Sequence, residues 1–376
     1  MPRAEGGIIR VGVSEAHGMA VEASSSPPAG VEYSFLEPQP SGFRFIRSAI
    51  KGYYRRFDAG DCDLIEAVIS PVKTRDRWIY WCEDLPSAAA FTLLGAPLPR
   101  AVRIAHLKRL FLADNFKKLV FWSNAGRRTL ESYAHIDDGR LVEKSTVVYP
   151  AVRPTPDELI CFSEDTDAVQ LLFSGDFFRK GGVNVIDAFE RLQRIHPAVR
   201  LVLCSDEKID FNTPNAALRS EYLGKIAANP AVDWLGRIKR DALMRTVLPK
   251  TDVYLLPTYN ETFGMAILEA IAAGIPVVAT NVFAIPEILE DEKSGLLIDV
   301  SAWDCASLFR GYLVNEIPGD FREYVTCALF EHLRRLVESP ALRRTLGTNG
   351  VAVARSRFSF AIRNARMLPI YQAAIA

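Results

Sequence analysis

The sequence has no cysteines or histidines spaced as metal ligands. Its six cysteines and five histidines are scattered singly, and no CxxC, HxxxH or HExxH pair occurs. Zinc sites and dithiol redox sites use such short spacings. We therefore expect no metal site, and we expect the cysteines to be apolar core residues of a protein in a reducing compartment.

Excess charge and long apolar runs are also lacking. Lys and Arg number 45 and Asp and Glu number 45, so no overall charge favours nucleic acid or an anionic membrane. The most apolar stretch, residues 265–279, contains Glu269 and Pro276 and is too short to span a bilayer. The first residues lack the apolar segment and cleavage site of a signal peptide. We expect a cytoplasmic protein with no nucleic-acid partner.

The composition is that of a globular chain with more than one domain. Of the 376 residues, 49% are hydrophobic and 24% charged, which excludes a disordered or fibrous chain. The stretch PAVRPTPDE at 150–158 is typical of an interdomain linker. We therefore expect an N-terminal domain at 1–155, a second domain at 156–350, and a C-terminal helix at 351–376 that is able to pack back on the first domain.

The second half alternates short apolar runs with amphipathic segments. Alternation of this kind predicts βα units, a parallel sheet and a doubly wound Rossmann-like domain. The expected strands are QLLFS, VRLVLCS, VDWLG, DVYLLPT and IPVVATN, and the expected helices include VNVIDAFERL, ALRSEYLGKIAA, KRDALMRTVL and MAILEAIAA. The C-terminal part from residue 328 onward is predicted to be mostly helical, with a cap at Ser339–Pro340 and a break near Ser359.

The first half is predicted to be a second, abbreviated α/β domain. Its expected strands are IIRVGV, VEYSFLE, CDLIEAVI, RWIYWC, KLVFWS and STVVYP. SSSPPAG at 24–30 predicts a loop where a crossover helix would be usual. Residues 43–57 have apolar residues at helical spacing and a basic face. That segment is either a core helix with a solvated face or a helix that contacts an anionic membrane.

Two segments could carry chemistry. FSGDFFRKGG at 173–182 joins a strand to a helix; Gly175 and Gly181 permit close backbone approach, and Arg179 and Lys180 add positive charge. A helix N-terminus behind such a loop suits a phosphate, although an ordinary glycine turn is the alternative. Glu269 lies on an otherwise apolar helix, so it needs either a basic partner or ligand hydroxyl groups.

These segments resemble the nucleotide-binding domain of retaining GT-B glycosyltransferases, specifically glycosyltransferase family 4 (group 1). Glu261 and Glu269 have the E-x7-E spacing within ETFGMAILEAIAAGIPVVATN. VDWLGRI, FSGDFFRKGG and the C-terminal helical stretch are similar to further motifs of that family, over roughly residues 165–360. The resemblance implies an α/β fold of GT-B architecture, with two Rossmann-like doubly wound domains that face a cleft.

The same resemblance implies roles for individual residues. Glu269 would accept hydrogen bonds from the ribose of a nucleotide-sugar donor, and Glu261 would contact the donor sugar. Lys180, with Arg179, would stabilise charge on the departing diphosphate. The remaining donor-binding positions are Gly175, Gly181, Ile238, Phe263, Gly264 and Met265. The nucleotide sugar is a substrate, so no cofactor and no metal is expected.

The sequence departs from the family pattern in two places. Asp176 stands where many relatives carry arginine after the glycine of the phosphate loop. A histidine that often contacts the donor sugar is missing from the N-terminal half; the corresponding region contains Glu83 and Asp84, as either a sugar contact or an exposed acidic pair. His17 is a further candidate contact, with a solvated loop histidine as the alternative.

The resemblance favours a retaining hexosyltransferase that acts without a metal. Its acceptor would be a glycan, a lipid-linked sugar or a small molecule, with peripheral contact to the inner face of the membrane in the lipid case. The alternative is a catalytically silent scaffold that binds nucleotide sugars. Sugar-nucleotide epimerases share the architecture but lack the E-x7-E context.

Overall fold

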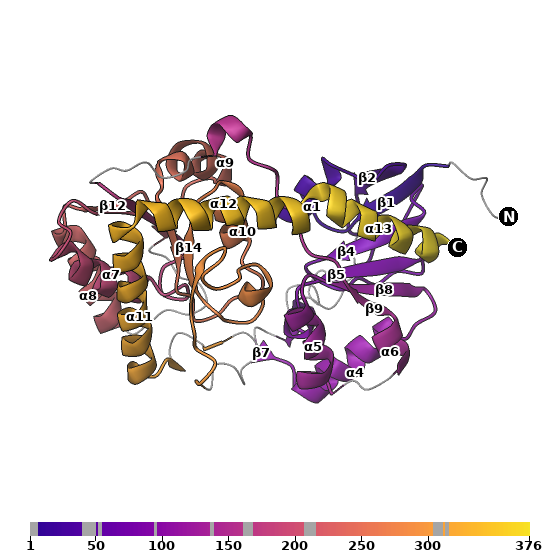
Figure 1. The fold of residues 1–376 in the computed structure, drawn as a ribbon. Helices are drawn as coiled ribbons and strands as arrows, with labels where there is room; N and C mark the ends of the chain where they lie inside the picture. The colour runs from indigo at the N-terminus through magenta and orange to yellow at the C-terminus, as the bar shows by residue number, and fades with distance from the viewer. Residues whose placement is uncertain are drawn as a thin grey trace. The chain divides into compact units, whose positions relative to one another are not determined.

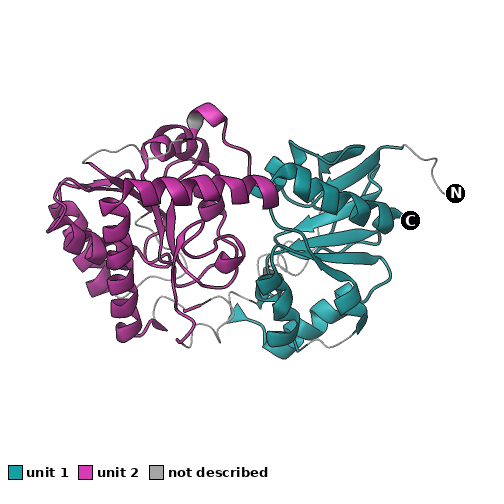
Figure 2. Cartoon of the chain, viewed as in Figure 1, with its two compact units in different colours: residues 1–151, 358–376 teal, residues 152–357 magenta. Residues whose placement is uncertain are grey.

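The chain forms two compact units (Figure 2). One unit comprises Met1–Ala151 and Phe358–Ala376, and the other comprises Val152–Arg357. These limits lie a few residues from the boundaries expected at 155 and 350. The computed structural model describes residues 7–39, 50–51, 55–93, 96–135, 139–160, 168–206, 216–303, 311–312 and 316–376.

The N-terminal unit contains a parallel six-stranded sheet in the order β2-β1-β4-β5-β8-β9. All six strands expected from the sequence are confirmed. Every residue of β4 and β5 is buried, as expected for strands covered on both faces. The strands are β1 (Ile9–Val13), β2 (Val31–Phe35), β4 (Leu64–Val68), β5 (Trp78–Cys82), β8 (Phe116–Phe121) and β9 (Ser145–Val147).

Short helices connect these strands. They are α1 (Gly18–Ser24), α3 (Leu85–Ala88), α4 (Arg100–Phe111), α5 (Asn124–Ser132) and α6 (Gly139–Glu143). The helix α1 precedes the predicted loop at 24–30, so the crossover between β1 and β2 is shortened rather than lost. The helix expected at 43–57 is wrong at Ile50–Lys51, which form strand β3 and pair with β6 (Thr92–Leu93); β6 also pairs with β7 (Ala96–Pro97). Residues 43–49 and 52–54 of that segment lie outside the described residues, and 55–57 are not helical either, since Arg56 forms an isolated β-bridge with Lys73.

The C-terminal unit contains a second parallel sheet, in the order β12-β11-β10-β13-β14-β15. This is the 3-2-1-4-5-6 order of doubly wound dinucleotide-binding folds. The five predicted strands are confirmed, and β15 is a sixth that the alternation did not reveal. The strands are β10 (Gln170–Asp176), β11 (Arg200–Asp206), β12 (Val232–Trp234), β13 (Val253–Leu256), β14 (Val277–Thr280) and β15 (Leu296–Ile298).

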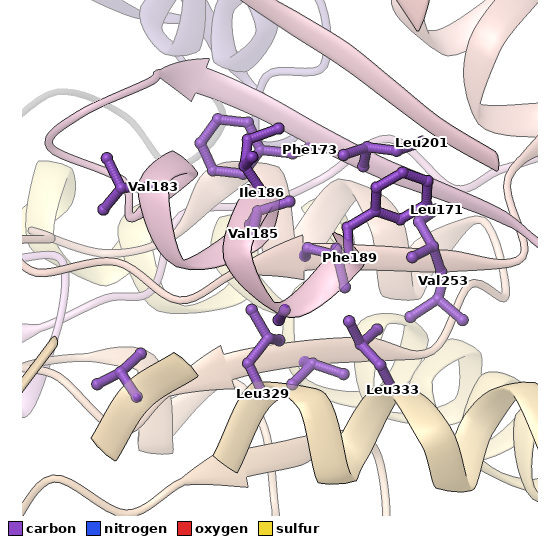
Figure 3. Packing of buried hydrophobic residues seen from close by; sticks show 14 of the residues in the cluster. Leu171, Phe173, Val183, Val185, Ile186, Phe189, Leu201, Val253, Leu329 and Leu333 are labelled. Carbon is purple, nitrogen blue, oxygen red and sulfur yellow. The ribbon is translucent and has the colours of Figure 1, made fainter. Parts of the chain in front are cut away.

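Helices cover this second sheet (Figure 1). The helix α7 packs against α11, and Figure 3 shows Phe189, Leu329 and Leu333 in the core between them. The principal helices are α7 (Gly182–Gln193), α8 (Ala216–Ala228), α10 (Met265–Ala272), α11 (Gly319–Glu338) and α12 (Pro340–Arg357), and the 3-10 turns η1 (Asp157–Leu159) and η4 (Ile285–Glu287) are shorter.

The expected helix KRDALMRTVL is not regular. It consists of a single turn α9 (Arg240–Ala242), a π-helical turn η2 (Leu243–Val247) and a 3-10 turn η3 (Leu248–Lys250). Pro249 lacks an N–H group, so one α-helical hydrogen bond is missing at this position. Mid-helix π and 3-10 geometry of this kind is frequent beside functional sites.

The last helix, α13 (Phe360–Ile375), belongs to the N-terminal unit and packs against β4 and β8. Ser359 caps it through the amide of Ile362 at 3.4 Å, which confirms the predicted break. α11 begins at Gly319, earlier than the expected start at 328. Among the described helices, none is long and apolar enough to cross a membrane.

A buried polar cluster fixes α13 to the sheet. The hydroxyl of Tyr371 donates to a carboxylate oxygen of Glu66 and lies 2.7 Å from the hydroxyl of Tyr33. Arg363 approaches Glu66 at 3.9 Å and stacks over the ring of Trp81 at 5.1 Å. Burial raises the pKa of Glu66, and Arg363 and Tyr371 offset this effect only in part.

We therefore expect Tyr371→Phe to destabilise the N-terminal unit. Removing the hydroxyl leaves a buried carboxylate with one donor fewer, which costs about 1–3 kcal/mol. Urea unfolding followed by a probe in that unit measures the loss. Tyr324→Phe removes a hydroxyl at an exposed site of the other unit and is the control. Equal stability of the two variants would contradict a structural role for the Glu66 cluster.

Candidate functional site

The candidate site lies where the C-terminal sheet changes its direction of winding. Strand β10 pairs with β11 on one side and with β13 on the other. The chain therefore leaves β10 and β13 toward opposite halves of the sheet. In open α/β sheets, ligands bind beside the carboxyl ends of the two strands at this point.

Two glycines shape the loop after β10. Gly175 has φ 113° and Gly181 has φ 82°, which side chains rarely adopt. A Cβ atom at position 181 would lie 2.0 Å from the carbonyl oxygen of Pro257, so only glycine allows this approach between backbones. The glycine thus holds the loop after β10 against the loop after β13.

Lys180 and Glu261 form an ion pair between these two loops. The Lys180 Nζ atom contacts Glu261 Oε2 and donates to the carbonyl of Asn260 at 3.4 Å. Glu261 Oε1 accepts a hydrogen bond from the amide of Thr262 at 2.9 Å. The two side chains are only 11% and 10% exposed. A cation and an anion are thus held together in a nearly buried position.

Burial and the partner act oppositely on these groups. Burial raises the pKa of Glu261, but the Lys180 ammonium and the hydrogen bonds from Lys180 and Thr262 outweigh it, so the pKa lies below its usual value. Burial lowers the pKa of Lys180, and the attraction of Glu261 offsets this only in part. Glu261 therefore favours its anionic form, and its carboxylate is the main group that favours the protonated form of Lys180.

Asp176 and Arg179 form a second pair within the same loop. The Nε atom of Arg179 lies 3.4 Å from Asp176 Oδ2, and the Arg179 amide donates to Oδ1 at 3.3 Å. Asp176 therefore closes the turn and is neutralised by the adjacent arginine. The cationic role expected of Arg179 would require this pair to open.

Glu269 is paired with Arg240, which the sequence analysis did not identify. Arg240 Nε lies 2.5 Å from Glu269 Oε1. The Glu269 side chain is 10% exposed, whereas that of Arg240 is 41% exposed. Burial raises the pKa of Glu269, and Arg240 lowers it by less. The sequence left open whether Glu269 has a basic partner or binds ligand hydroxyl groups. The structure contains the ion pair, and its cation is accessible to solvent.

The start of α10 supplies main-chain donors next to Glu261. Gly264 caps the helix with φ 107°, and Phe263 is buried while Met265 is half-buried. The first N–H groups of an α-helix have no partner within the helix and attract anions. Ile238 is half-buried and follows Gly236, whose φ is 67°.

Buried hydrogen bonds connect the ends of the strands that carry these loops. The Ser174 and Tyr254 hydroxyls lie 2.8 Å apart between β10 and β13. Thr280 donates to the carbonyl of Thr258 at 2.7 Å. These residues are buried and fix the two loops; their types are too common in strands for the sequence to reveal them.

The three remaining candidates lie in the N-terminal unit. Asp84 is fully buried and caps α3, because its Oδ1 atom accepts a hydrogen bond from the amide of Ser87 at 2.6 Å. Glu83 is half-buried and accepts from the Ser87 hydroxyl at 3.3 Å. His17 is exposed at the start of α1. Among the described residues, no group of His, Cys, Asp and Glu is arranged to hold a metal ion.

We expect the Lys180–Glu261 pair to show strong coupling in stability. Lys180→Met leaves the Glu261 carboxylate buried without its cation, and removing one partner of a buried pair costs about 3–5 kcal/mol. The double variant Lys180→Met/Glu261→Gln removes both charges, so it should be more stable than Lys180→Met alone. Chemical unfolding of the wild type, Lys180→Met, Glu261→Gln and the double variant measures the coupling. Additive effects would show that the pair is not a unit.

Residues 162–309 match the family model described as "Glycosyl transferases group 1". Alpha-maltose-1-phosphate synthase of Mycolicibacterium smegmatis is 30% identical over 61% of this chain and 54% of its own length. A phosphatidyl-myo-inositol mannosyltransferase of Mycobacterium tuberculosis is 28% identical over 54% of this chain and 46% of its own. The chain thus spans about half the length of these relatives.

Solved structures share the fold at low sequence identity. A glycosyltransferase from Rickettsia africae has a TM-score of 0.62 at 13% identity and covers 98% of this chain and 99% of its own. The Anabaena protein HepE, solved with UDP and glucose, has a TM-score of 0.62 at 16% identity and covers 96% and 98%. The expected GT-B architecture of two Rossmann-like units is confirmed.

Proposed function

We propose that the chain, of which residues 162–309 match the group 1 glycosyl transferase model and which has the GT-B fold, is a retaining glycosyltransferase. It moves a hexosyl group from a nucleotide-sugar donor to a glycan, a lipid-linked sugar or a small molecule. One observation carries the proposal: the nearly buried Lys180–Glu261 pair lies at the sheet's switch point, beside the N-terminus of α10.

In this proposal the donor diphosphate lies against the amides of Phe263, Gly264 and Met265. Lys180 faces the oxygen that leaves the anomeric carbon and stabilises the negative charge that develops there. Such preorganised charge is often the largest catalytic contribution, and removing one donor typically costs about 10²–10³ in rate. Positive charge supplied by the protein itself is the reason for proposing transfer without a metal.

The two glutamates have separate roles. Glu261 accepts hydrogen bonds from hydroxyls of the transferred sugar, and Glu269 accepts them from the ribose. The acceptor hydroxyl forms the new bond to the anomeric carbon as the bond to the diphosphate oxygen breaks, and the departing diphosphate takes the electron pair. The acceptor's proton leaves with the diphosphate or to solvent. Retention of configuration places the incoming and departing oxygens on the same face of the sugar.

Each charged candidate is paired before a donor binds, so binding exchanges partners. Ribose hydroxyls replace the Arg240 guanidinium as hydrogen-bond donors to Glu269. The exposed Arg240 side chain then moves away from this carboxylate. The Arg179–Asp176 pair, on the same loop as Lys180, can open toward the diphosphate. These exchanges limit donor affinity, because each pair that opens offsets part of the binding free energy.

We expect Glu269→Ala to lose donor binding. A thermal-shift panel of UDP-, GDP- and ADP-sugars against wild type and variant measures this, and HepE's complex with UDP makes UDP-sugars the first choice. A ligand at about 100 times its dissociation constant stabilises by about 2.7 kcal/mol. Lys293→Ala, which changes an exposed ion pair, is the control. Equal shifts in wild type and Glu269→Ala would remove Glu269 from the donor site.

The same panel separates the enzyme from a silent scaffold. Wild type that binds a nucleotide sugar should also release nucleoside diphosphate, slowly to water and faster with a suitable acceptor. A coupled assay that follows the release of nucleoside diphosphate measures the turnover rate. Binding of a nucleotide sugar without any release of nucleoside diphosphate would favour the silent scaffold. The Asp176–Arg179 ion pair supports this alternative, because it engages a cation that the proposed mechanism uses.

We expect donor affinity to depend on pH through Glu269. Ionised Glu269 accepts hydrogen bonds from hydroxyls, so affinity falls as pH drops through its pKa, which burial raises above the usual value. Arg240 lowers this pKa, so Arg240→Ala should move the fall to higher pH. Titration calorimetry over the acid range measures both profiles. Superimposable profiles would show that Arg240 does not act on Glu269.

A further inference from the structure

The N-terminal unit contains a cavity of about 730 Å³ that the proposed function does not use. Trp78, which begins β5, and Asn115, which precedes β8, lie in its lining. The cavity is therefore at the amino-terminal edge of the sheet, whereas parallel sheets bind their usual ligands at the carboxyl edge. It is also in a different unit from Lys180 and Glu261.

The lining is rich in basic side chains. They come from the segment before β4, from the connection between β4 and β5, and from the last turns of α4. The five are Arg56, Lys73, Arg75, His106 and Arg109. A concave surface lined mostly by one sign of charge concentrates counter-ions.

The two acidic residues of the lining are engaged by neighbouring groups. Asp76 Oδ2 accepts from the amide of Ala59 at 2.8 Å and from the Thr74 hydroxyl at 3.1 Å. Asp58 Oδ1 accepts from the amide of Gly60 at 2.9 Å. These carboxylates stabilise turns and keep their negative charge, but the basic side chains of the lining outnumber them.

Three arginines of the lining are solvent-exposed and form no direct ion pair among the described residues. Within the part of the chain that the structure describes, no carboxylate forms an ion pair with Arg56, Arg75 or Arg109. Their guanidinium groups therefore have donors available to a ligand. Arginine donates several N–H groups in a planar fork that matches phosphate oxygens.

The scaffold that carries these cations is held by main-chain hydrogen bonds. Lys73 exchanges two of them with the segment before β4, at 2.9 Å to Arg55 and 3.0 Å from Phe57. The Asn115 amide donates to the carbonyls of Thr74 and Asp76, both at 3.0 Å. The backbone positions that carry the basic groups are therefore fixed, and the lining also includes the buried rings of Phe57 and Trp78.

Like charges crowd one another in this cavity. Burial lowers the pKa of Lys73, and Arg56 and Arg109 lower it further. Burial also lowers the pKa of His106, with further lowering by Lys73 and Arg109. A bound anion would relieve this repulsion.

We propose that this cavity binds a small soluble anion that carries two or more phosphate groups. Several cations from three segments suit more than one phosphate, and the volume is within the range of about 300–1,000 Å³ usual for small-molecule sites. The recessed shape favours a soluble ligand over a flat lipid surface. Arg75 and Arg109 are the main phosphate contacts, and Arg56, Lys73 and His106 complete the site.

Pyrophosphate is the probe for this site. Titration calorimetry compares wild type with Arg75→Ala/Arg109→Ala and with Arg10→Ala/Arg366→Ala, which removes two exposed arginines of the same unit outside the cavity. We expect affinity to fall by roughly tenfold or more in the first variant, because charge-assisted hydrogen bonds are lost. The control variant should bind as wild type does.

Hydrogen exchange of the wild type locates the bound pyrophosphate. Protection should appear in residues 72–76 and 106–115 and should persist in Lys180→Ala. Protection confined to residues 175–182 and 263–265 would assign the anion to the donor site and overturn the proposal. This readout stands even if the double arginine variant does not fold.

A vesicle arm distinguishes a lipid source of the same chemistry. Wild type and the cavity variant are sedimented with phosphatidylglycerol vesicles. Equal sedimentation together with lost pyrophosphate binding supports the soluble anion. Sedimentation that depends on Arg75 and Arg109, with no pyrophosphate binding in wild type, would overturn it in favour of a lipid headgroup. Neither result bears on transfer from a nucleotide sugar, so the two proposals fail separately.

Discussion

The candidate site depends on one buried ion pair, between Lys180 and Glu261. Two loops that leave the sheet in opposite directions are held together there, and the approach of Gly181 to Pro257 permits the contact. A lysine this deeply buried stays charged only beside an anion. Glu261 therefore does two things in the proposed mechanism: it maintains the charge of Lys180 and it faces the donor sugar.

The site is preorganised by mutual compensation. Asp176 is neutralised by Arg179, and Glu269 by Arg240. If these carboxylates had no basic partners, unpaired negative charges would lie at one edge of the sheet, and burying such charges is costly. In the proposed complex, the donor's hydroxyls replace Arg240 as the partner of Glu269, and its diphosphate replaces Asp176 as the partner of Arg179. The asymmetry in exposure matters: Glu269 is fixed in the helix, while Arg240 reaches solvent and is the member that can move.

Much of the fold could be predicted from the sequence, because strands buried on both faces are continuous apolar runs. The site segments could be found because Gly175, Gly181 and Gly264 mark unusual backbone, and because Glu269 is conspicuous on an apolar helix. Arg240 could not be singled out, since an arginine in a charged stretch carries no signal of its partner. The irregular turns at 240–250 could not be predicted either, because the apolar periodicity of this segment is that of a regular helix. Residues 50–51 show the same limit, since helical spacing there is overridden by pairing with β6.

The most direct measurement of the central claim is the structure of the chain with a bound nucleoside diphosphate. The account predicts the diphosphate against the amides at 263–265 with Lys180 beside it, the ribose hydroxyls on Glu269, and Arg240 withdrawn from that carboxylate. A nucleotide bound elsewhere, with Glu269 still held by Arg240, would contradict the account.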